Sequence, residues 1–258
     1  MKKLVLALGL FCAPLGAAAE VGSTVLRDVV DHHILPRYTT LAEHTDALAA
    51  VAQQNCAADD AALRDAYHDA FDAWIAVSHL RFGPSETDNR AFALAFWPDS
   101  RGATPKALGQ MIRDEDPVVE SLDSFQNVSI AARGFYAMEF LLYDDQFSTA
   151  GSEAYRCALI QVMSADIAAT SAAILADWED GYADLMRDPG NNTYRTGEEA
   201  AKQLFTALST GLEFTEDTRI GRAMGSYDRP RPLRAEARRS GRSLRHVVLS
   251  LAALRDLG

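Results

Sequence analysis

Residues 134–142 read Gly134-Phe135-Tyr136-Ala137-Met138-Glu139-Phe140-Leu141-Leu142. Wound as a helix at about 100° per residue, this run has almost no polar face. The pattern therefore predicts a helix that is buried on nearly all sides. Glu139 is the exception, because an ionised carboxylate is costly to bury unless a cation, several donors or a metal ion compensates its charge. The segment predicts a helical core with a structural network or a functional site around Glu139.

The rest of the chain is rich in alanine with helical periodicity, and strand patterns are sparse. We therefore predict an all-α protein. The region between residues 82 and 101 has no clear period and carries several glycine, proline and aspartate residues, so it is expected to form a long structured loop. The expected helices cover about 25–53 (kinked or broken near Pro36), 129–143, 153–175 or beyond, 196–217 and 243–257.

The first residues predict export from the cytoplasm. Lys2-Lys3, an apolar run and Ala17-Ala18-Ala19 follow the order of a secretory signal peptide, with cleavage expected after Ala19. The apolar run is too short for a permanent anchor, and we predict no transmembrane segment in the mature protein. Residues 1–19 are thus interpreted as a signal peptide, and residues 20–258 as a periplasmic protein.

Charge is distributed unevenly along the mature chain. Removing residues 1–19 takes away two lysines and changes the formal net charge from −11 to −13. Residues 20–218 hold 33 acidic and 13 basic residues, whereas residues 219–258 hold ten arginines. The export signal and the negative charge argue against nucleic-acid binding. The arginine-rich end is expected to pack on the acidic body, and binding of an anionic ligand is the alternative.

Two cysteines remain after processing, Cys56 and Cys157. An oxidising compartment favours a disulfide between them. A metal site is the alternative, but neither cysteine has further ligands in its immediate sequence neighbourhood.

The helix around Glu139 resembles the signature of the imelysin family of bacterial cell-envelope proteins, Gly-x-His-x-x-Glu followed by Phe-Leu. Gly134 and Glu139 match, and Tyr136 stands at the histidine position. The resemblance extends over nearly the whole mature chain and implies a pair of helical bundles with long irregular connections and a groove between them. We place the boundary between the bundles at about 145–152. The other similar segments are 31–38, Trp74 with 81–84, 96–99 and 238–244.

Tyr136 and Glu139 lie one turn apart on the same helix face. Phenolate and carboxylate are hard oxygen donors that suit ferric iron, so both are candidate metal ligands. His33, in a segment that resembles the family, is the third candidate. The alternative is structural: the Tyr136 hydroxyl donates a hydrogen bond to Glu139 or to a backbone carbonyl.

A second group of candidates lies in and beside the predicted loop. Arg81, Trp97, Asp99 and Arg101 are candidate ligand-binding residues, because arginines can hold an anion through bidentate contacts. The alternative is structural pairing, in which one of these arginines neutralises Glu139.

The sequence contains no His-Glu-x-x-His motif and no glycine-rich phosphate loop, which argues against an enzyme. The resemblance implies a role in iron or haem acquisition. We predict a periplasmic binding protein for ferric iron or haem, working with an outer-membrane receptor or an iron transporter component. Two alternatives stay open: a metallopeptidase of the imelysin type, and a structural or partner-binding protein whose metal site decayed through Tyr136.

Overall fold

The computed structural model describes residues 16–258, and within these residues there are helices and loops but no β-sheet. This confirms the all-α prediction. The predicted signal peptide lies almost entirely outside the described residues, since its first fifteen positions precede them. The long helices are α1 (Gly16–Val29), α2 (Leu35–Gln54), α3 (Ala61–Val77), α9 (Glu153–Asp177), α11 (Gly197–Glu213) and α13 (Ser243–Leu257).

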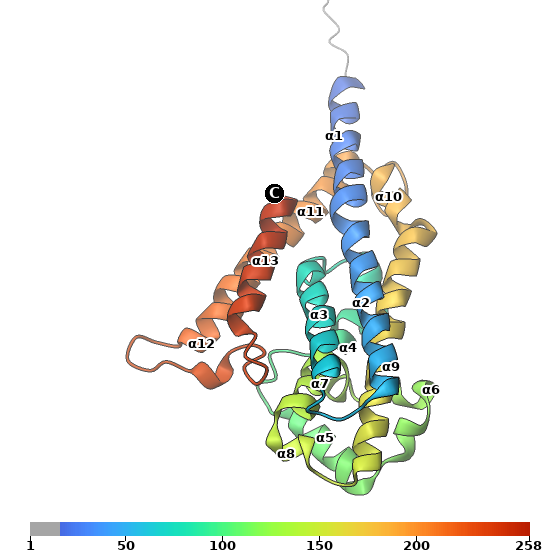
Figure 1. Cartoon of the computed structure of the whole chain (residues 1–258). Helices are drawn as coiled ribbons and strands as arrows, with labels where there is room; N and C mark the ends of the chain where they lie inside the picture. Colours follow the sequence, from blue (N-terminus) through green and yellow to red (C-terminus); the bar gives the residue numbers. More distant parts are fainter. Residues whose placement is uncertain (1–15) are drawn as a thin grey trace, which may run out of the picture.

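Helices α1 and α2 form one long column, joined by the π-helical turn η1 (Val30–Ile34) (Figure 1). The break expected near Pro36 is not seen, because the backbone is helical on both sides of it. Pro36 lies in the first turn of α2, where its missing N–H costs little. The irregularity is the π turn that precedes it.

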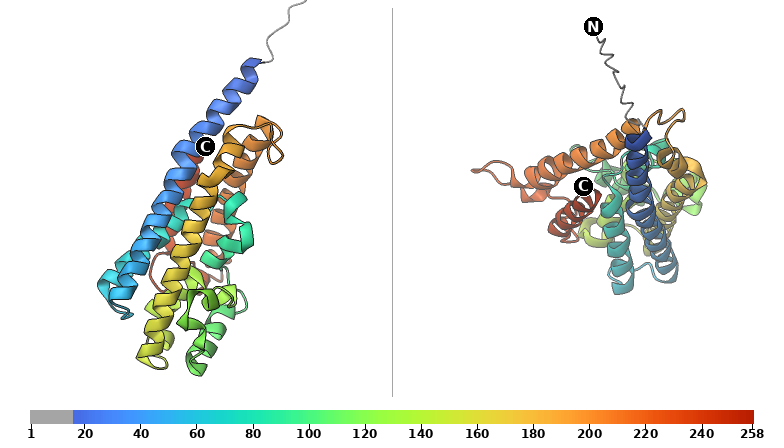
Figure 2. Two further views of the ribbon diagram at one scale, coloured as in Figure 1. Left: turned by 90° about the vertical axis from the view of Figure 1, so that its right-hand side faces the viewer. Right: turned by 90° about the horizontal axis from the view of Figure 1, so that it is seen from above.

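The core lies between α2, α3 and α9, which pack side by side (Figures 1 and 2). Helix α9 also packs on α7 (Gly134–Tyr143). Together with η6 (Trp178–Tyr182) and α10 (Ala183–Arg187), α9 forms a segment long and apolar enough to cross a membrane. More than half of its apolar window is buried inside the molecule, as in a core helix. The prediction that the mature chain has no membrane span remains a prediction.

Short helices follow α3 in the sequence, and all of them but α4 (Arg90–Leu94) gather at one end of the molecule, the lower end in Figure 1. They are separated by 3-10 turns and are formed by residues of the predicted loop and of the segment that follows it in the sequence. The predicted helix 129–143 is divided at Gly134, which has a φ of +76°. A Cβ at this position would collide with the backbone carbonyl oxygens of Ala93 and Leu94, so only glycine allows α7 to start here. These helices are α4 (Arg90–Leu94), α5 (Ala103–Asp114), α6 (Leu122–Phe125), α7 and α8 (Asp145–Ser148).

The C-terminal part forms an arm along one flank (Figures 1 and 2). Helix α11 continues through the π-helical segment η7 (Phe214–Gly221) into α12 (Arg222–Met224). The chain then turns back through η8 (Pro232–Arg234), and α13 returns beside α11 and over α3. The predicted helices over 153–175 and 243–257 are confirmed.

A disulfide joins Cys56, in the loop between α2 and α3, to Cys157 in α9, as predicted. The buried apolar cluster is continuous from α1 to α11 and includes residues on both sides of 145–152. The division into two bundles at that boundary stays a prediction.

Candidate functional site

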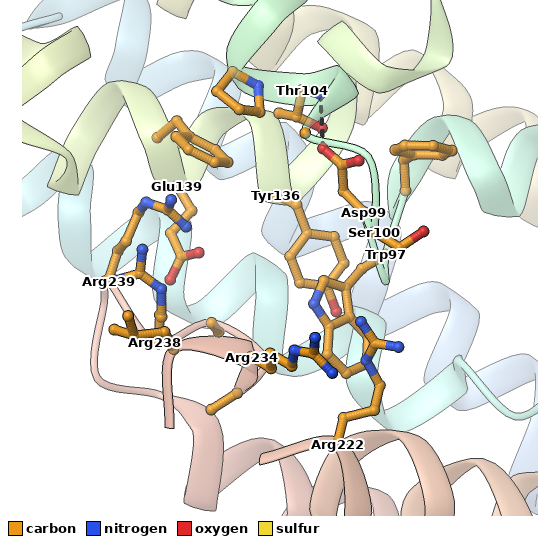
Figure 3. Close-up of a pocket in the computed structure, with 17 residues that line it drawn as sticks. Trp97, Asp99, Ser100, Thr104, Tyr136, Glu139, Arg222, Arg234, Arg238 and Arg239 are labelled. Carbon is orange, nitrogen blue, oxygen red and sulfur yellow. Dashed lines mark hydrogen bonds between the residues drawn. The ribbon is translucent and has the colours of Figure 1, made fainter. Parts of the chain in front are cut away.

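A pocket of about 360 Å³ opens where three segments meet: the loop after α4, helix α7, and the chain from α12 to the start of α13 (Figure 3). The loop supplies Trp97 and Asp99, and α7 supplies Tyr136 and Glu139. The third segment brings most of the charge, in the form of Arg222, Arg234, Arg238 and Arg239.

Tyr136 lines the pocket with its ring, which stacks on Trp97 at a centroid distance of 5.9 Å. Its hydroxyl donates to Oε1 of Glu236 and not to Glu139 or a backbone carbonyl, which corrects the structural alternative drawn from the sequence. Burial, reinforced by the nearby Glu236 carboxylate, raises the pKa of Tyr136 well above its ordinary value. Tyr136 is therefore a neutral phenol at physiological pH.

Glu236 is the centre of a buried polar network behind the pocket wall. It is 1% exposed, and its Oε2 accepts a hydrogen bond from Arg219 Nε at 2.9 Å and lies 3.3 Å from His246 Nδ1. Arg219 also donates to Ser250 Oγ at 3.2 Å. Burial acts to raise the pKa of Glu236, but the Arg219 charge, the adjacent His246 ring and the hydrogen bond from Tyr136 outweigh it and lower this pKa. No local spacing in the sequence could have indicated this network.

Glu139 is 2% exposed and is compensated by neutral donors. Its Oε1 accepts hydrogen bonds from the backbone N–H of Ser240 at 2.9 Å and from the Ser240 hydroxyl at 2.7 Å. Among residues 16–258, no hydrogen-bond partner is seen for Oε2, and the residue lines the pocket. Glu139 therefore retains one oxygen that a ligand can reach.

The four pocket arginines differ in their partners. Arg239 donates to Asp144 at 2.6 Å and lies over the ring of Phe140. No carboxylate lies within ion-pair distance of the other three in the described part of the chain: Arg222, Arg234 and Arg238. The Nε of Arg222 is also buried without a hydrogen bond. Unpaired guanidinium groups gathered around one pocket attract an anion.

The structure places two of the four predicted ligand-binding residues at the pocket. Trp97 and Asp99 line it, whereas Arg81 and Arg101 do not. Arg81 pairs with Glu86 at 2.6 Å, and neither arginine pairs with Glu139, contrary to the neutralising role considered from the sequence. Asp99 is structural, since its carboxylate accepts backbone N–H groups at the start of α5. Burial acts to raise the pKa of Asp99, but these hydrogen bonds outweigh it and lower this pKa.

His33 lies outside the pocket, where its Nε2 is 2.9 Å from Nε2 of the buried His79. Burial lowers the pKa of His33 to about 4 and that of His79 to about 3, so both rings are neutral at pH 7. The structure therefore does not bring Tyr136, Glu139 and His33 into one metal site. Within the described residues, no three or more His, Cys, Asp or Glu side chains are grouped so that they could hold a metal ion.

The imelysin family model (peptidase M75) matches residues 34–257, and the chain thus belongs to the imelysin family. An imelysin-like protein from Psychrobacter arcticum is similar in structure, with a TM-score of 0.73 and 19% identity over 98% of this chain and 76% of that one. A second similar structure, from Parabacteroides distasonis, is described as an iron-regulated protein A precursor. It has a TM-score of 0.78 and 16% identity over 92% of this chain and 73% of that one. No curated protein matches this chain.

Proposed function

We propose that this protein is a non-enzymatic, periplasmic binding component of iron acquisition whose ligand is an anion held in the arginine-lined pocket. One observation carries the proposal: three pocket arginines lack a carboxylate partner among the described residues, and they line the same pocket as Glu139, whose Oε2 has no hydrogen-bond partner there. The family, and the description of one structural relative as iron-regulated, support the link to iron.

The pocket chemistry favours iron that brings its own ligands. A bare ferric ion needs several hard donors, and the pocket offers one free carboxylate oxygen and a protonated phenol. Arginine forks bind carboxylates through paired hydrogen bonds. A ferric polycarboxylate chelate, or haem through its propionates, would place carboxylates on Arg222, Arg234 and Arg238. Glu139 Oε2 could then approach the metal, and the flat Trp97 ring would cover one side.

Calorimetric titration of the mature protein with ferric citrate, citrate alone and haem tests this proposal and separates its sources. We expect binding of at least one of these carboxylate ligands, weakened at least tenfold in the Arg234→Ala/Arg238→Ala variant because each charged contact contributes about 1.5–3 kcal/mol. Arg113→Ala is the matched control, since Arg113 is exposed and lies outside the pocket. If no carboxylate ligand binds, or if the double variant binds as tightly as the wild type, the proposal is wrong.

The non-enzymatic part of the proposal has its own test. The purified protein, supplied with zinc, is expected to leave an unstructured protein substrate intact. Cleavage that is lost in Glu139→Gln and absent from a mock purification would instead favour the metallopeptidase alternative.

A further inference from the structure

Large apolar side chains are exposed on the outward side of two neighbouring helices, α11 and α13. We refer to this surface as the α11–α13 face and define it by the five residues Phe205 (69% exposed), Leu212 (45%), Leu244 (75%), Val248 (58%) and Leu251 (42%). Single exposed apolar residues are common, but a cluster on adjacent elements marks a site of interaction.

The helical geometry makes these residues one continuous strip. Leu244, Val248 and Leu251 follow the spacing of a single face of α13, and Phe205 and Leu212 do the same on α11. The two helices run antiparallel (Figures 1 and 2). They touch where Gly211 leaves room for Leu254. On each helix, the exposed apolar residues lie on the side opposite the buried residues, next to this contact.

The exposed charges beside the strip have opposite signs on the two helices. The C-terminal end of α11 and the following η7 carry the exposed Glu213 and Glu216, whereas α13 carries the exposed Arg255. Arg245 of α13 is already paired with Asp72 on α3. The surface is therefore acidic beside Leu212 and basic at Arg255. An anionic membrane fits this surface poorly, because the acidic residues lie beside Leu212 and would be repelled.

We infer that the α11–α13 face binds a second copy of this chain. In this dimer, α11 and α13 of each copy form one layer, and the two layers pack face to face around a two-fold axis parallel to the helices. A two-fold interface must be complementary to itself, and this axis places α11 of one copy opposite α13 of the other. The two apolar strips then cover each other. Because Gly211 lies beside Leu254 in each copy, Glu213 comes opposite Arg255 of the other copy at nearly the same height.

Sedimentation velocity of the mature, oxidised protein over a wide concentration range tests this inference. We expect a reversible dimer, weakened at least tenfold by Leu244→Glu/Val248→Glu. Val25→Glu is the matched control, because Val25 is a comparably exposed apolar residue on α1. A monomer at all concentrations, or a dimer that the double variant leaves unchanged, would overturn the inference.

Charge reversal distinguishes a second copy from another occupant. Glu213→Arg and Arg255→Glu are each expected to weaken the dimer, and the two together to restore it, because the pair then meets with reversed signs. Binding of the monomer to anionic vesicles through the same leucines would also overturn the inference. Carboxylate binding at the pocket is independent of these substitutions, so failure here does not bear on the proposed function.

Discussion

The charged carboxylate of Glu236 fixes the orientation and protonation of Tyr136 in the pocket wall. It holds Tyr136 as a hydrogen-bond donor and is itself held ionised by Arg219. The phenol is therefore part of a structural network, and the free arginines and Glu139 are the groups that face a ligand. Tyr136, at the position where the family motif has histidine, shapes the wall through its ring while its hydroxyl points away to Glu236.

Glu236→Gln is expected to destabilise the fold by about 3–5 kcal/mol, because it leaves the buried Arg219 charge without its partner. Urea denaturation at pH 7 measures the loss. Glu86→Gln, which breaks the more exposed pair with Arg81, should cost about 1 kcal/mol or less. Adding Arg219→Gln to Glu236→Gln should recover part of the stability. Equal effects of the two single variants would contradict the role assigned to Glu236.

His33 and His79 make stability depend on pH in the acidic range. Their folded-state pKa values of about 4 and about 3 lie below the unfolded value of about 6.5. Because the native state keeps both rings neutral, their contribution is complete above about pH 6.5 and is lost as pH falls toward 4. We expect a loss of roughly 6 kcal/mol between pH 7 and pH 4 from this pair, about 3 kcal/mol from each histidine.

Urea denaturation at several pH values isolates this contribution by difference. The His33→Gln/His79→Gln variant should show a smaller fall in unfolding free energy than the wild type over the same range. His32→Gln, at a neighbouring exposed histidine, should keep the wild-type dependence. Parallel curves for the wild type and the double variant would refute the assignment.

At the scale of elements, local periodicity predicted α9 and α13 almost to their ends, since each has one face that must be buried. Tyr136 and Glu139, which the helix spacing put on one face, both line the pocket, and their role as metal ligands stays a prediction. It could not predict their partners, Glu236 and Ser240, which the fold brings from a distant segment. Arg81 and Arg101 illustrate the limit: a nearby cluster of suitable residue types does not determine which side chains face the site.

Gly134 fixes the position of α7 against α4 and hence the placement of the pocket residues. Gly134→Ala should destabilise the protein by several kcal/mol, because the Cβ would meet two backbone carbonyls that cannot move aside. Gly190→Ala is the control: φ is also positive there, at +114°, but no atom lies within 4 Å of the added Cβ. That variant should lose about 1 kcal/mol, from backbone strain alone. Thermal denaturation of both variants compares the two; similar midpoints would show that the close approach at Gly134 is unimportant.

At the scale of the whole molecule, the uneven charge has two structural consequences. Arg242 and Arg245 in the C-terminal segment pair with Asp72 on α3, and Arg239 pairs with Asp144, so the segment does pack on the acidic body as the sequence indicated. Three arginines of the same segment that have no carboxylate partner among the described residues line the pocket: Arg222, Arg234 and Arg238. The sequence presented two alternatives for the arginine-rich end, packing on the acidic body and binding of an anion. The two roles are compatible, because different arginines are available for each.

The disulfide joins two segments that are distant in the sequence, the α2–α3 loop and α9, across a separation of 101 residues. Closing a loop of that length restricts the unfolded chain by about 4–5 kcal/mol in the chain-entropy model. Cys56→Ser/Cys157→Ser should lower the unfolding free energy by about 4 kcal/mol and the melting temperature by roughly 10 °C. Wild-type protein treated with a reductant should reach the same midpoint, and the variant should show no further change on reduction. If the oxidised, reduced and variant proteins unfold together, the crosslink does not restrain the unfolded chain, and the packing of α2 and α3 on α9 alone accounts for the stability of this region.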